Sequence, residues 1–302
     1  MEIKAKSSVH AKFKLVVHSV QDDKVTKETG WFNNLVLDSG LERMSAGTWI
    51  NRCCVGTGNS TPVVSQTALD GFLASTTTTQ ATTSSVQTTA TPYYSSVTVT
   101  WRFSAGSATG NISEVGLGWS NTTLWNRSLI KDSSGEATTI TVLSDEYLDV
   151  VSEIRVYPSE TYSGSFDLKD ASGSVISSHT VSGSPFLYPP TSVFNQISSY
   201  QLEVYSGVKN DSPTTSPTTG LGTTFTVTTT YPTPTKVQSV FTIPLTACNG
   251  THQSFRIPAT GLLCNGGSAQ TSYKFQITPT ITKTSSQVMT YTFTIEWGRY
   301  TE

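Results

Sequence analysis

Two charged residues, Glu114 and Arg127, have the spacing of a pair that meets across a β-hairpin. Residues 112–119 and 124–130 alternate in polarity as strands do, and the Asn-Thr dipeptide between them is typical of a tight turn. A two-residue turn would set Glu114 diagonal to Arg127 on one face of the hairpin, within reach of a long side chain. We therefore predict a structural ion pair at Glu114 and Arg127, and not a catalytic carboxylate.

The other motifs lack the partner residues that catalysis or cofactor binding requires. Gly56–Asn59 is short of the Gly-Lys-Ser/Thr ending of a phosphate loop, and no long helix is expected after it. The patterns Gly-x-Ser-x-Gly and His-Glu-x-x-His do not occur, and the four histidines are isolated from one another. We therefore predict no catalytic residues, no cofactor and no metal site, and hence no enzyme.

The four cysteines leave two alternatives open. Cys53 and Cys54 are neighbours, and neighbours in a strand point to opposite faces, so these two should not pair with each other. Cys248 and Cys264 each begin a Cys-Asn-Gly turn and could form a disulfide after release from a cell. Buried thiols are the alternative that a reducing compartment favours. The cysteine spacing does not support a zinc site.

Aromatic residues give the remaining signal for binding. Tyr93 and Tyr94 follow a hydroxyl-rich segment and Pro92, so we expect this pair to be exposed. There it could form a surface binding site that stacks on sugars. Most other aromatic side chains of a β-sandwich belong to its core. Further candidates for stacking are Trp119, Trp125, Tyr188 and Tyr200.

The alternation of polar and apolar residues predicts strands through most of the chain, with residues 11–18 and 147–157 as clear cases. Only two short helical turns are expected, one capped by Asp38 and one at residues 68–74. Four lysines near the start of the chain suggest the solvated face of an edge strand. These lysines are Lys4, Lys6, Lys12 and Lys14.

Together the elements predict an all-β protein of two antiparallel, jelly-roll-like β-sandwich domains with one or two very short helices. The turns in residues 158–164 separate an N-terminal domain, residues 1–157, from a C-terminal domain, residues 158–302. The Ser75–Thr91 segment is almost all Thr, Ser, Gln and Ala. It is either an exposed loop or arm, or a polar strand pair. Residues 211–222 have the composition of a linker.

Bulk composition narrows the range of partners. Only 13% of the 302 residues are charged, against about a quarter in a typical domain, and the net charge is −2. This balance predicts no nucleic-acid partner. No apolar run approaches the ~18 residues of a membrane span, so we expect no membrane insertion. No secretory signal precedes the first strand, so we expect assembly in a cytoplasm.

The chain carries a series of short patterns in a fixed order: GWFNNLVLDSGLERM, CCVGTGNSTPVVSQTALDGFL, WRFSAGSATGNISEVGLGW and LWNRSLIKDSSGEATTITV. In order and spacing these patterns resemble a family of tailed-bacteriophage virion proteins, found among tail and tail-fibre components. The later segment ITPTITKTSSQVMTYTFTIEWGRY resembles the C-terminal end of the same family. Residues 158–270 resemble the family only in their general type of sequence and carry none of its specific patterns.

The resemblance implies a non-enzymatic structural component of a phage virion, associated with the tail or tail fibre, with host attachment as a further role. It also implies a homo-oligomer, a trimer or a ring, that contacts other virion proteins and is released by lysis. Two alternatives stay open at this stage. One is a capsid-decorating or head-fibre protein, and the other is an adhesin that binds glycans of the host surface.

Overall fold

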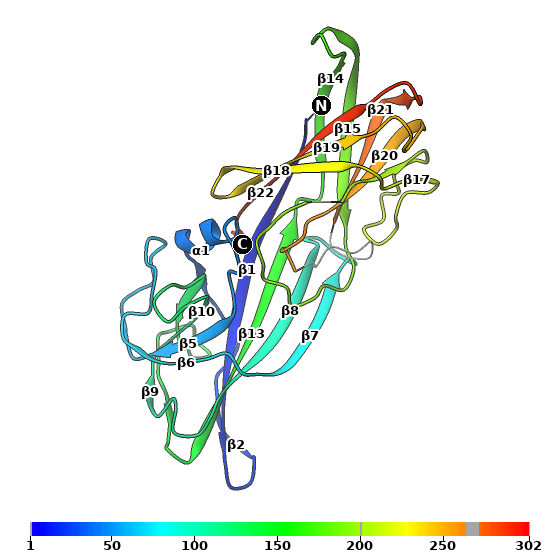
Figure 1. The fold of residues 1–302 in the computed structure, drawn as a ribbon. Coiled ribbons are helices and arrows are strands. Elements are labelled where there is room, and N and C mark those ends of the chain that lie inside the picture. Colours follow the sequence, from blue (N-terminus) through cyan, green and yellow to red (C-terminus); the bar gives the residue numbers. More distant parts are fainter. Residues whose placement is uncertain (1, 200, 264–271, 302) are drawn as a thin grey trace.

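The computed structural model describes residues 2–199, 201–263 and 272–301 and has an elongated shape built almost wholly of strands (Figure 1). The one helix in these ranges, α1 (Asp38–Arg43), has six residues. No helix in the described part of the chain is long and apolar enough to cross a membrane. The predicted fold class, all-β with antiparallel sheets and a very short helix, is confirmed.

A long sheet of nine strands runs through the molecule, in the order β18-β19-β22-β1-β13-β8-β7, with β2 and β3 also paired to β1. Its strands are β1 (Glu2–Ser19), β2 (Val25–Glu28), β3 (Phe32–Asn33), β7 (Thr79–Gln87), β8 (Tyr94–Phe103), β13 (Glu146–Pro158), β18 (Thr226–Thr233), β19 (Lys236–Ile243) and β22 (Met289–Arg299). The strands that alternation predicts at residues 11–18 and 147–157 are thus confirmed as parts of β1 and β13.

Three smaller sheets complete the fold. The five-stranded sheet contains β4 (Leu35–Val36), β5 (Arg52–Gly56), β6 (Phe72–Thr76), β10 (Glu114–Gly118) and β11 (Asn126–Leu129). The six-stranded sheet contains β14 (Tyr162–Lys169), β15 (Val175–Phe186), β16 (Glu203–Tyr205), β17 (Gly220–Gly222), β20 (Gly250–Pro258) and β21 (Ser272–Lys283). A two-stranded sheet pairs β9 (Gly110–Ile112) with β12 (Ile140–Val142).

In the inner strands of the long sheet, such as β1 and β13, one face is buried along the length of the strand. In β1 every second side chain from Ile3 to Val17 is buried, as the alternation of the sequence requires. The six-stranded sheet covers one end of this face, where Tyr273 of β21 packs against Phe293 of β22 with ring centres 5.9 Å apart. The five-stranded sheet lies beside the other end (Figure 1). The main hydrophobic core therefore extends under both covering sheets, and a small separate cluster contains Leu37, Cys54, Leu69 and Leu124.

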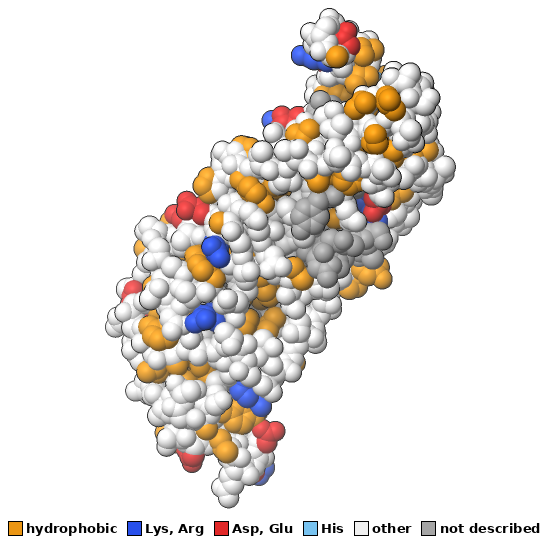
Figure 2. Space-filling model, viewed as in Figure 1, with side chains coloured by type: hydrophobic (Ala, Val, Ile, Leu, Met, Phe, Trp, Pro, Cys, Tyr) orange, Lys and Arg blue, Asp and Glu red, His pale blue; other side chains and the backbone are white. Residues whose placement is uncertain are grey.

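The opposite face of the long sheet carries the four N-terminal lysines, so the prediction of a solvated face is confirmed. The prediction of an edge strand is wrong, because β1 lies between β13 and β22. Its pairing with β22 is parallel, unlike the other described strand pairs. β22 lies near the far end of the chain, and alternation within β1 carries no information on so distant a partner. Figure 2 shows charged side chains scattered over one side of the molecule among uncharged ones.

Two predictions about helices are also wrong. Asp38 does not cap α1 but lies in its first turn, where its carboxylate accepts a hydrogen bond from Arg299. The predicted helical turn at residues 68–74 is replaced by a loop and the start of β6, which pairs with β5. Pairing with a neighbouring strand here outweighs a weak local signal for helix.

Most of the Ser75–Thr91 segment forms β7, a single polar and largely exposed strand that pairs antiparallel with β8 at the end of the long sheet. The division between residues 157 and 158 stays a prediction. The long sheet takes strands from both sides of that division. Contacts also cross it, since the Trp49 indole N–H donates to the carbonyls of Asn195 and Gly261.

Candidate functional site

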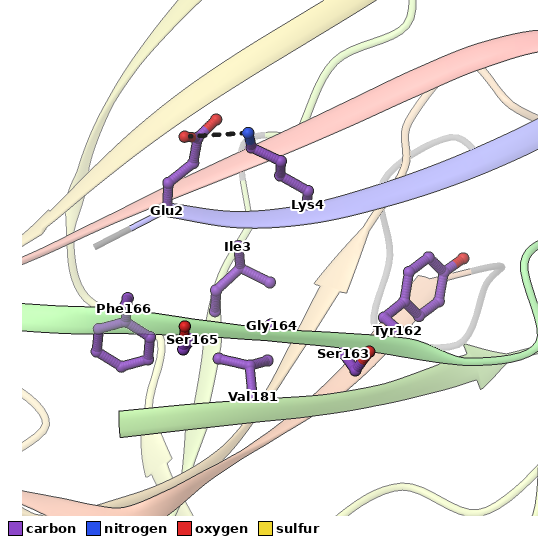
Figure 3. Close-up of a pocket in the computed structure, with 9 residues that line it drawn as sticks. All are labelled: Glu2, Ile3, Lys4, Tyr162, Ser163, Gly164, Ser165, Phe166 and Val181. Carbon is purple, nitrogen blue, oxygen red and sulfur yellow. Dashed lines mark ion pairs between the residues drawn. The ribbon is translucent and has the colours of Figure 1, made fainter. Parts of the chain in front are cut away.

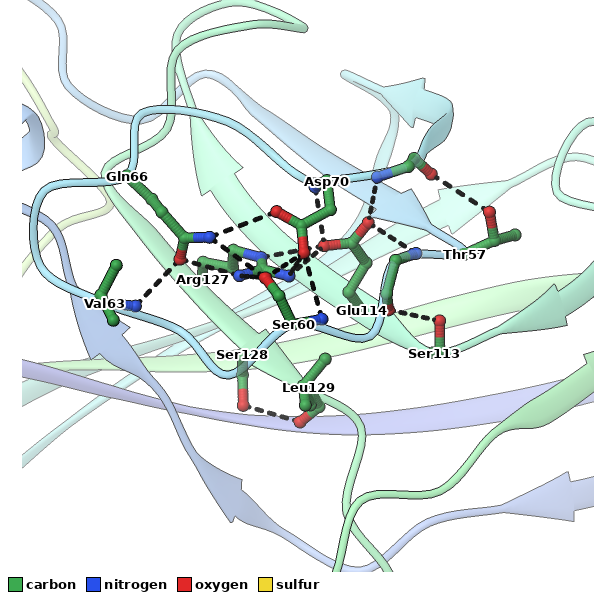
Figure 4. A network of polar contacts seen from close by, with 12 residues as sticks. Thr57, Ser60, Val63, Gln66, Asp70, Ser113, Glu114, Arg127, Ser128 and Leu129 are labelled. Carbon is green, nitrogen blue, oxygen red and sulfur yellow. Dashed lines mark hydrogen bonds and ion pairs between the residues drawn. The ribbon is translucent and has the colours of Figure 1, made fainter.

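The structure brings Glu114 and Arg127 together inside the five-stranded sheet (Figure 4). Glu114 faces Leu129 and Val115 faces Ser128 across the hairpin, in the predicted register, but beside the turn Leu124 faces Gly118 and not Trp119. Arg127 Nε donates to Glu114 Oε2 at 2.9 Å, and Arg127 Nη2 lies 2.8 Å from the same oxygen. Both side chains are 0% exposed, so the pair is fully removed from water.

The same two side chains hold the loop between β5 and β6. Glu114 Oε1 accepts hydrogen bonds from the backbone N–H groups of Gly58 and Gly71, at 2.9 and 2.7 Å. Glu114 Oε2 accepts a further one from the N–H of Asp70 at 3.1 Å. The glycine-rich residues that superficially suggest a phosphate loop therefore surround a carboxylate of the protein itself.

Arg127 fixes the side chains of this loop. Its Nη1 donates to Gln66 Oε1 and its Nη2 to Asp70 Oδ2, each at 2.8 Å. The Ser60 hydroxyl, and after it the Arg127 guanidinium, hold the pKa of Asp70 below its ordinary value. The network thus consists of two carboxylates, one amide and one hydroxyl around a single buried guanidinium.

Glu114 and Arg127 thus form a structural clamp, a buried ion pair that holds the loop between β5 and β6. A carboxylate offers about four acceptor positions, and Glu114 fills them with three backbone N–H groups and Arg127. No lone pair is left to accept a proton from a substrate. Substitution at the glycines is also excluded on steric grounds, because a Cβ at Gly58 would lie 2.5 Å from Glu114 Oε1.

The six-stranded sheet contains a second clamp that the sequence did not reveal. Arg256 of β20 binds Glu203 of β16 through two hydrogen bonds, of 2.9 and 2.6 Å, and also donates to the Ser216 hydroxyl at 2.9 Å. Residues 211–222, which have the composition of a linker, are therefore held as a loop that ends in β17. The prediction of a linker is wrong.

Lys274 of β21 completes this second clamp. Its side chain is 0% exposed, and its Nζ donates to the carbonyls of Asn210, Ser212 and Thr215 at 2.7, 2.5 and 2.9 Å. Burial, and after it the nearby Lys209 ammonium, lowers the pKa of Lys274 to about 8. The acceptors are backbone carbonyls of a loop, which side-chain patterns do not identify, so this site could not be predicted from the sequence.

Tyr93 and Tyr94, which we expected to be exposed, are both partly buried. Tyr94 lies beneath Arg155, whose guanidinium carbon is 4.5 Å from the ring centre, and packs against Tyr157 at 5.2 Å. Tyr157 stacks in turn on Tyr300, with ring centres 3.8 Å apart. The three tyrosines and Arg155 form an aromatic cluster on the solvated face of the long sheet. Binding of a glycan there stays a prediction.

The other aromatic candidates differ in their surroundings. Trp125 is fully buried and packs against Trp49 at 5.0 Å, so it belongs to the core. Trp119 is partly buried beside Arg43. Tyr188 is 48% exposed. Tyr200 lies outside the described residues.

The cysteines Cys53, Cys54 and Cys248 are buried. Burial raises the pKa of Cys53, raises that of Cys54 to about 12 and raises that of Cys248, which favours the protonated form of each thiol. Cys264 lies outside the described residues, so a disulfide between Cys248 and Cys264 stays a prediction.

His252, the histidine nearest to Cys248 in the sequence, has both ring nitrogens engaged. One lies 2.5 Å from the Tyr291 hydroxyl and the other 2.7 Å from the Cys248 carbonyl oxygen. Within the described ranges, no three His, Cys, Asp or Glu side chains lie close enough together to hold a metal ion.

A cleft of about 290 Å³ lies between the start of β1 and β14 (Figure 3). Ile3 and Val181 form its apolar walls, and Ser163 and Ser165 supply hydroxyl groups. Glu2 and Lys4 at its edge form an ion pair with each other at 3.7 Å. The lining thus combines apolar side chains, two hydroxyl groups and one exposed ion pair.

Comparison with known proteins gives no relationship: no protein-family model, no curated protein and no solved structure matches the chain.

Proposed function

We propose that the protein is a non-enzymatic structural component of a tailed-phage virion, associated with the tail or tail fibre, and that it works as a homo-oligomer alongside other virion proteins. The observation that carries the non-enzymatic part is the saturation of Glu114 and Arg127, the buried charged pair, by bonds that hold the fold. The ordered sequence patterns support the virion part. An elongated, nearly all-strand molecule suits a component that makes contacts at both ends.

Purified virions of the phage that encodes the chain provide the test of the proposed role. We expect the chain in virions at a fixed copy number, and antibody labelling or a density map to place it on the tail or tail fibre. Location on the head would favour a capsid-decorating or head-fibre protein instead. Failure to detect the chain in purified virions by mass spectrometry would overturn the proposal.

The absence of enzymatic activity has a separate test. Purified protein incubated with host capsule or peptidoglycan should release no reducing sugar and no peptide fragments. Cleavage that is abolished by one carboxylate substitution, such as Asp70→Asn or Glu203→Gln, would contradict the proposal.

A second candidate function, a glycan-binding adhesin, is favoured by the aromatic cluster of Tyr94, Tyr157 and Tyr300. Tyr157 is buried, but the rings of Tyr94 and Tyr300 are partly exposed, and such rings can stack on sugars. A glycan array discriminates between a scaffold and an adhesin. An adhesin should retain specific glycans and lose them in Tyr94→Ala but not in Tyr188→Ala, a tyrosine outside the cluster. A scaffold should bind none of them.

A further inference from the structure

The strand β7 ends the long sheet on one side, and no described strand pairs with its outer edge. Figure 1 shows β7 at the margin of the ribbon, beyond β8. Side chains from Thr79 to Ser85 are exposed, so neither face of the strand is covered there. A strand edge of this kind presents unpaired backbone N–H and C=O groups, which are complementary to another strand.

From Ala81 to Gln87 this edge lacks the features that normally prevent pairing. Proteins protect exposed edges with charged side chains, prolines or bulges. From Ser75 to Thr91 the chain has no charged residue and no proline. The pairing of β7 with β8 shifts register only near Thr79 and is then regular from Ala81 to Gln87, so most of the strand is straight and available.

The opposite edge of the long sheet, β18, is less suited to pairing. It contains Pro232, which has no N–H to donate, and its register shifts between Thr230 and Thr233. Of the two ends of the long sheet, β7 therefore offers the edge without proline.

We infer that β7 is a self-association surface and that its partner is β7 of a second copy, paired antiparallel about a two-fold axis. In such a pair each strand faces its own sequence reversed, and the neutral composition means that no like charges meet in any register. With the axis at Thr83, Ala81 faces Ser85 and Thr82 faces Ser84. The two long sheets then join into one continuous sheet. This inference deepens the proposed function and rests on its claim that the protein self-associates.

Substitutions at Thr83, an exposed residue in the middle of β7, test the pairing directly. Near a two-fold axis the residue meets its own copy, so Thr83→Lys or Thr83→Glu places like charges together and should raise the dissociation constant of the dimer at least about tenfold. Mixing the two variants in equal amounts places Lys opposite Glu and should restore the dimer. Thr228→Lys makes the same change at an exposed position of β18 and serves as the control.

Sedimentation velocity over a range of concentrations measures the oligomeric state of each protein. Thermal melting shows whether all variants stay folded. We expect a dimer for the wild type, for Thr228→Lys and for the mixture, and mostly monomer for each Thr83 variant alone. A monomeric wild type, Thr83 variants that dimerise as the wild type does, or a loss of assembly in Thr228→Lys would overturn the inference. The location of the chain in virions would stay a separate question under each of those outcomes.

Discussion

At the scale of single residues, Arg127 is the clearest source of stability. Its guanidinium is fully buried and binds Glu114, Asp70 and Gln66. Arg127→Ala removes the cation and leaves the Glu114 carboxylate buried beside it without a counter-charge. Breaking one side of a buried ion pair costs about 3–5 kcal/mol, so we expect a loss of that order in the free energy of unfolding, measured by urea denaturation.

The matched control for this prediction is Lys14→Ala. Lys14 forms an ion pair with Glu28 at 2.8 Å, but the two side chains are 28% and 54% exposed. An exposed pair contributes at most about 1 kcal/mol, so this variant should unfold nearly as the wild type does. Equal stability of Arg127→Ala and the wild type would show that the Glu114–Arg127 pair is not structural.

Lys274 gives a prediction about pH. Its pKa is about 8 in the folded protein and close to its ordinary 10.5 in the unfolded chain. Between these pH values the unfolded chain holds a proton that the folded protein has released, so raising the pH favours the folded state. We expect the contribution of Lys274 to stability to improve by up to about 3 kcal/mol from pH 8 to pH 10.5.

Measurement against a Lys274→Met variant isolates this contribution, because tyrosines also titrate near pH 10. Urea denaturation of both proteins at several pH values gives the difference in their free energies of unfolding. As the pH rises from 8 to 10.5, the free energy of unfolding of the wild type should increase relative to that of the variant. A difference that stays flat, or that moves in favour of the variant, would contradict the lowered pKa.

The two clamps differ in how far the sequence could predict them. Glu114 and Arg127 belong to one hairpin, so alternation and a turn signal were enough to place them on one face. The groups that surround them, such as the N–H of Gly58 and of Gly71, come from a loop whose path depends on tertiary contacts. For Lys274 the acceptors are carbonyls, which every residue has, and no pattern of side chains distinguishes them.

At the scale of elements, two hairpin turns share one local design. Asp132 and Asp170 each begin an Asp-x-Ser-Gly sequence and accept hydrogen bonds from the serine N–H and hydroxyl two residues later. The Ser172 hydroxyl, and after it backbone N–H groups, hold the pKa of Asp170 below its ordinary value. The following Gly173 has a φ of +89°, which residues with a Cβ rarely adopt.

Gly173→Ala should therefore destabilise the hairpin of β14 and β15. A left-handed backbone costs a residue with a Cβ about 1–2 kcal/mol, and a thermal melt should show a loss of stability of that order. Gly164→Ala in β14 of the same hairpin is the control, because a Cβ there meets nothing within 4 Å. If both variants melt alike, the turn does not depend on the glycine backbone.

Strands themselves were predictable because burial of one face imposes a period of two, as in β1 and β13. Strand partners were less predictable. The parallel pairing of β1 with β22 joins residues nearly 300 positions apart, as in Ile3 with Phe293, and nothing local encodes it. The prediction of a helical turn at residues 68–74 was wrong because of a similar non-local pairing. Part of this segment forms β6, which pairs with β5.

At the scale of the whole molecule, one long sheet carries two covering sheets. The N-terminal part of β1, from Glu2 to Val9, pairs with β22, and its later part pairs with β2 and β3. The predicted N-terminal and C-terminal domains thus share a strand that serves both. Their hydrophobic side chains also form one continuous core.

This sharing leads us to expect a single cooperative unfolding transition for the whole protein. A fragment of residues 1–157 would lose β22 from beside β1 and would leave the indole N–H of Trp49 without its acceptors, Asn195 and Gly261. The remainder would lose the Leu41 carbonyl that accepts from Trp297 at 2.9 Å. Each fragment alone should therefore fail to fold, as judged by near-ultraviolet circular dichroism and resolved amide signals.

In the intact protein, tryptophan fluorescence and far-ultraviolet circular dichroism should report one common midpoint in urea. Two separate midpoints, or a folded fragment of residues 1–157, would instead establish the two halves as independent domains.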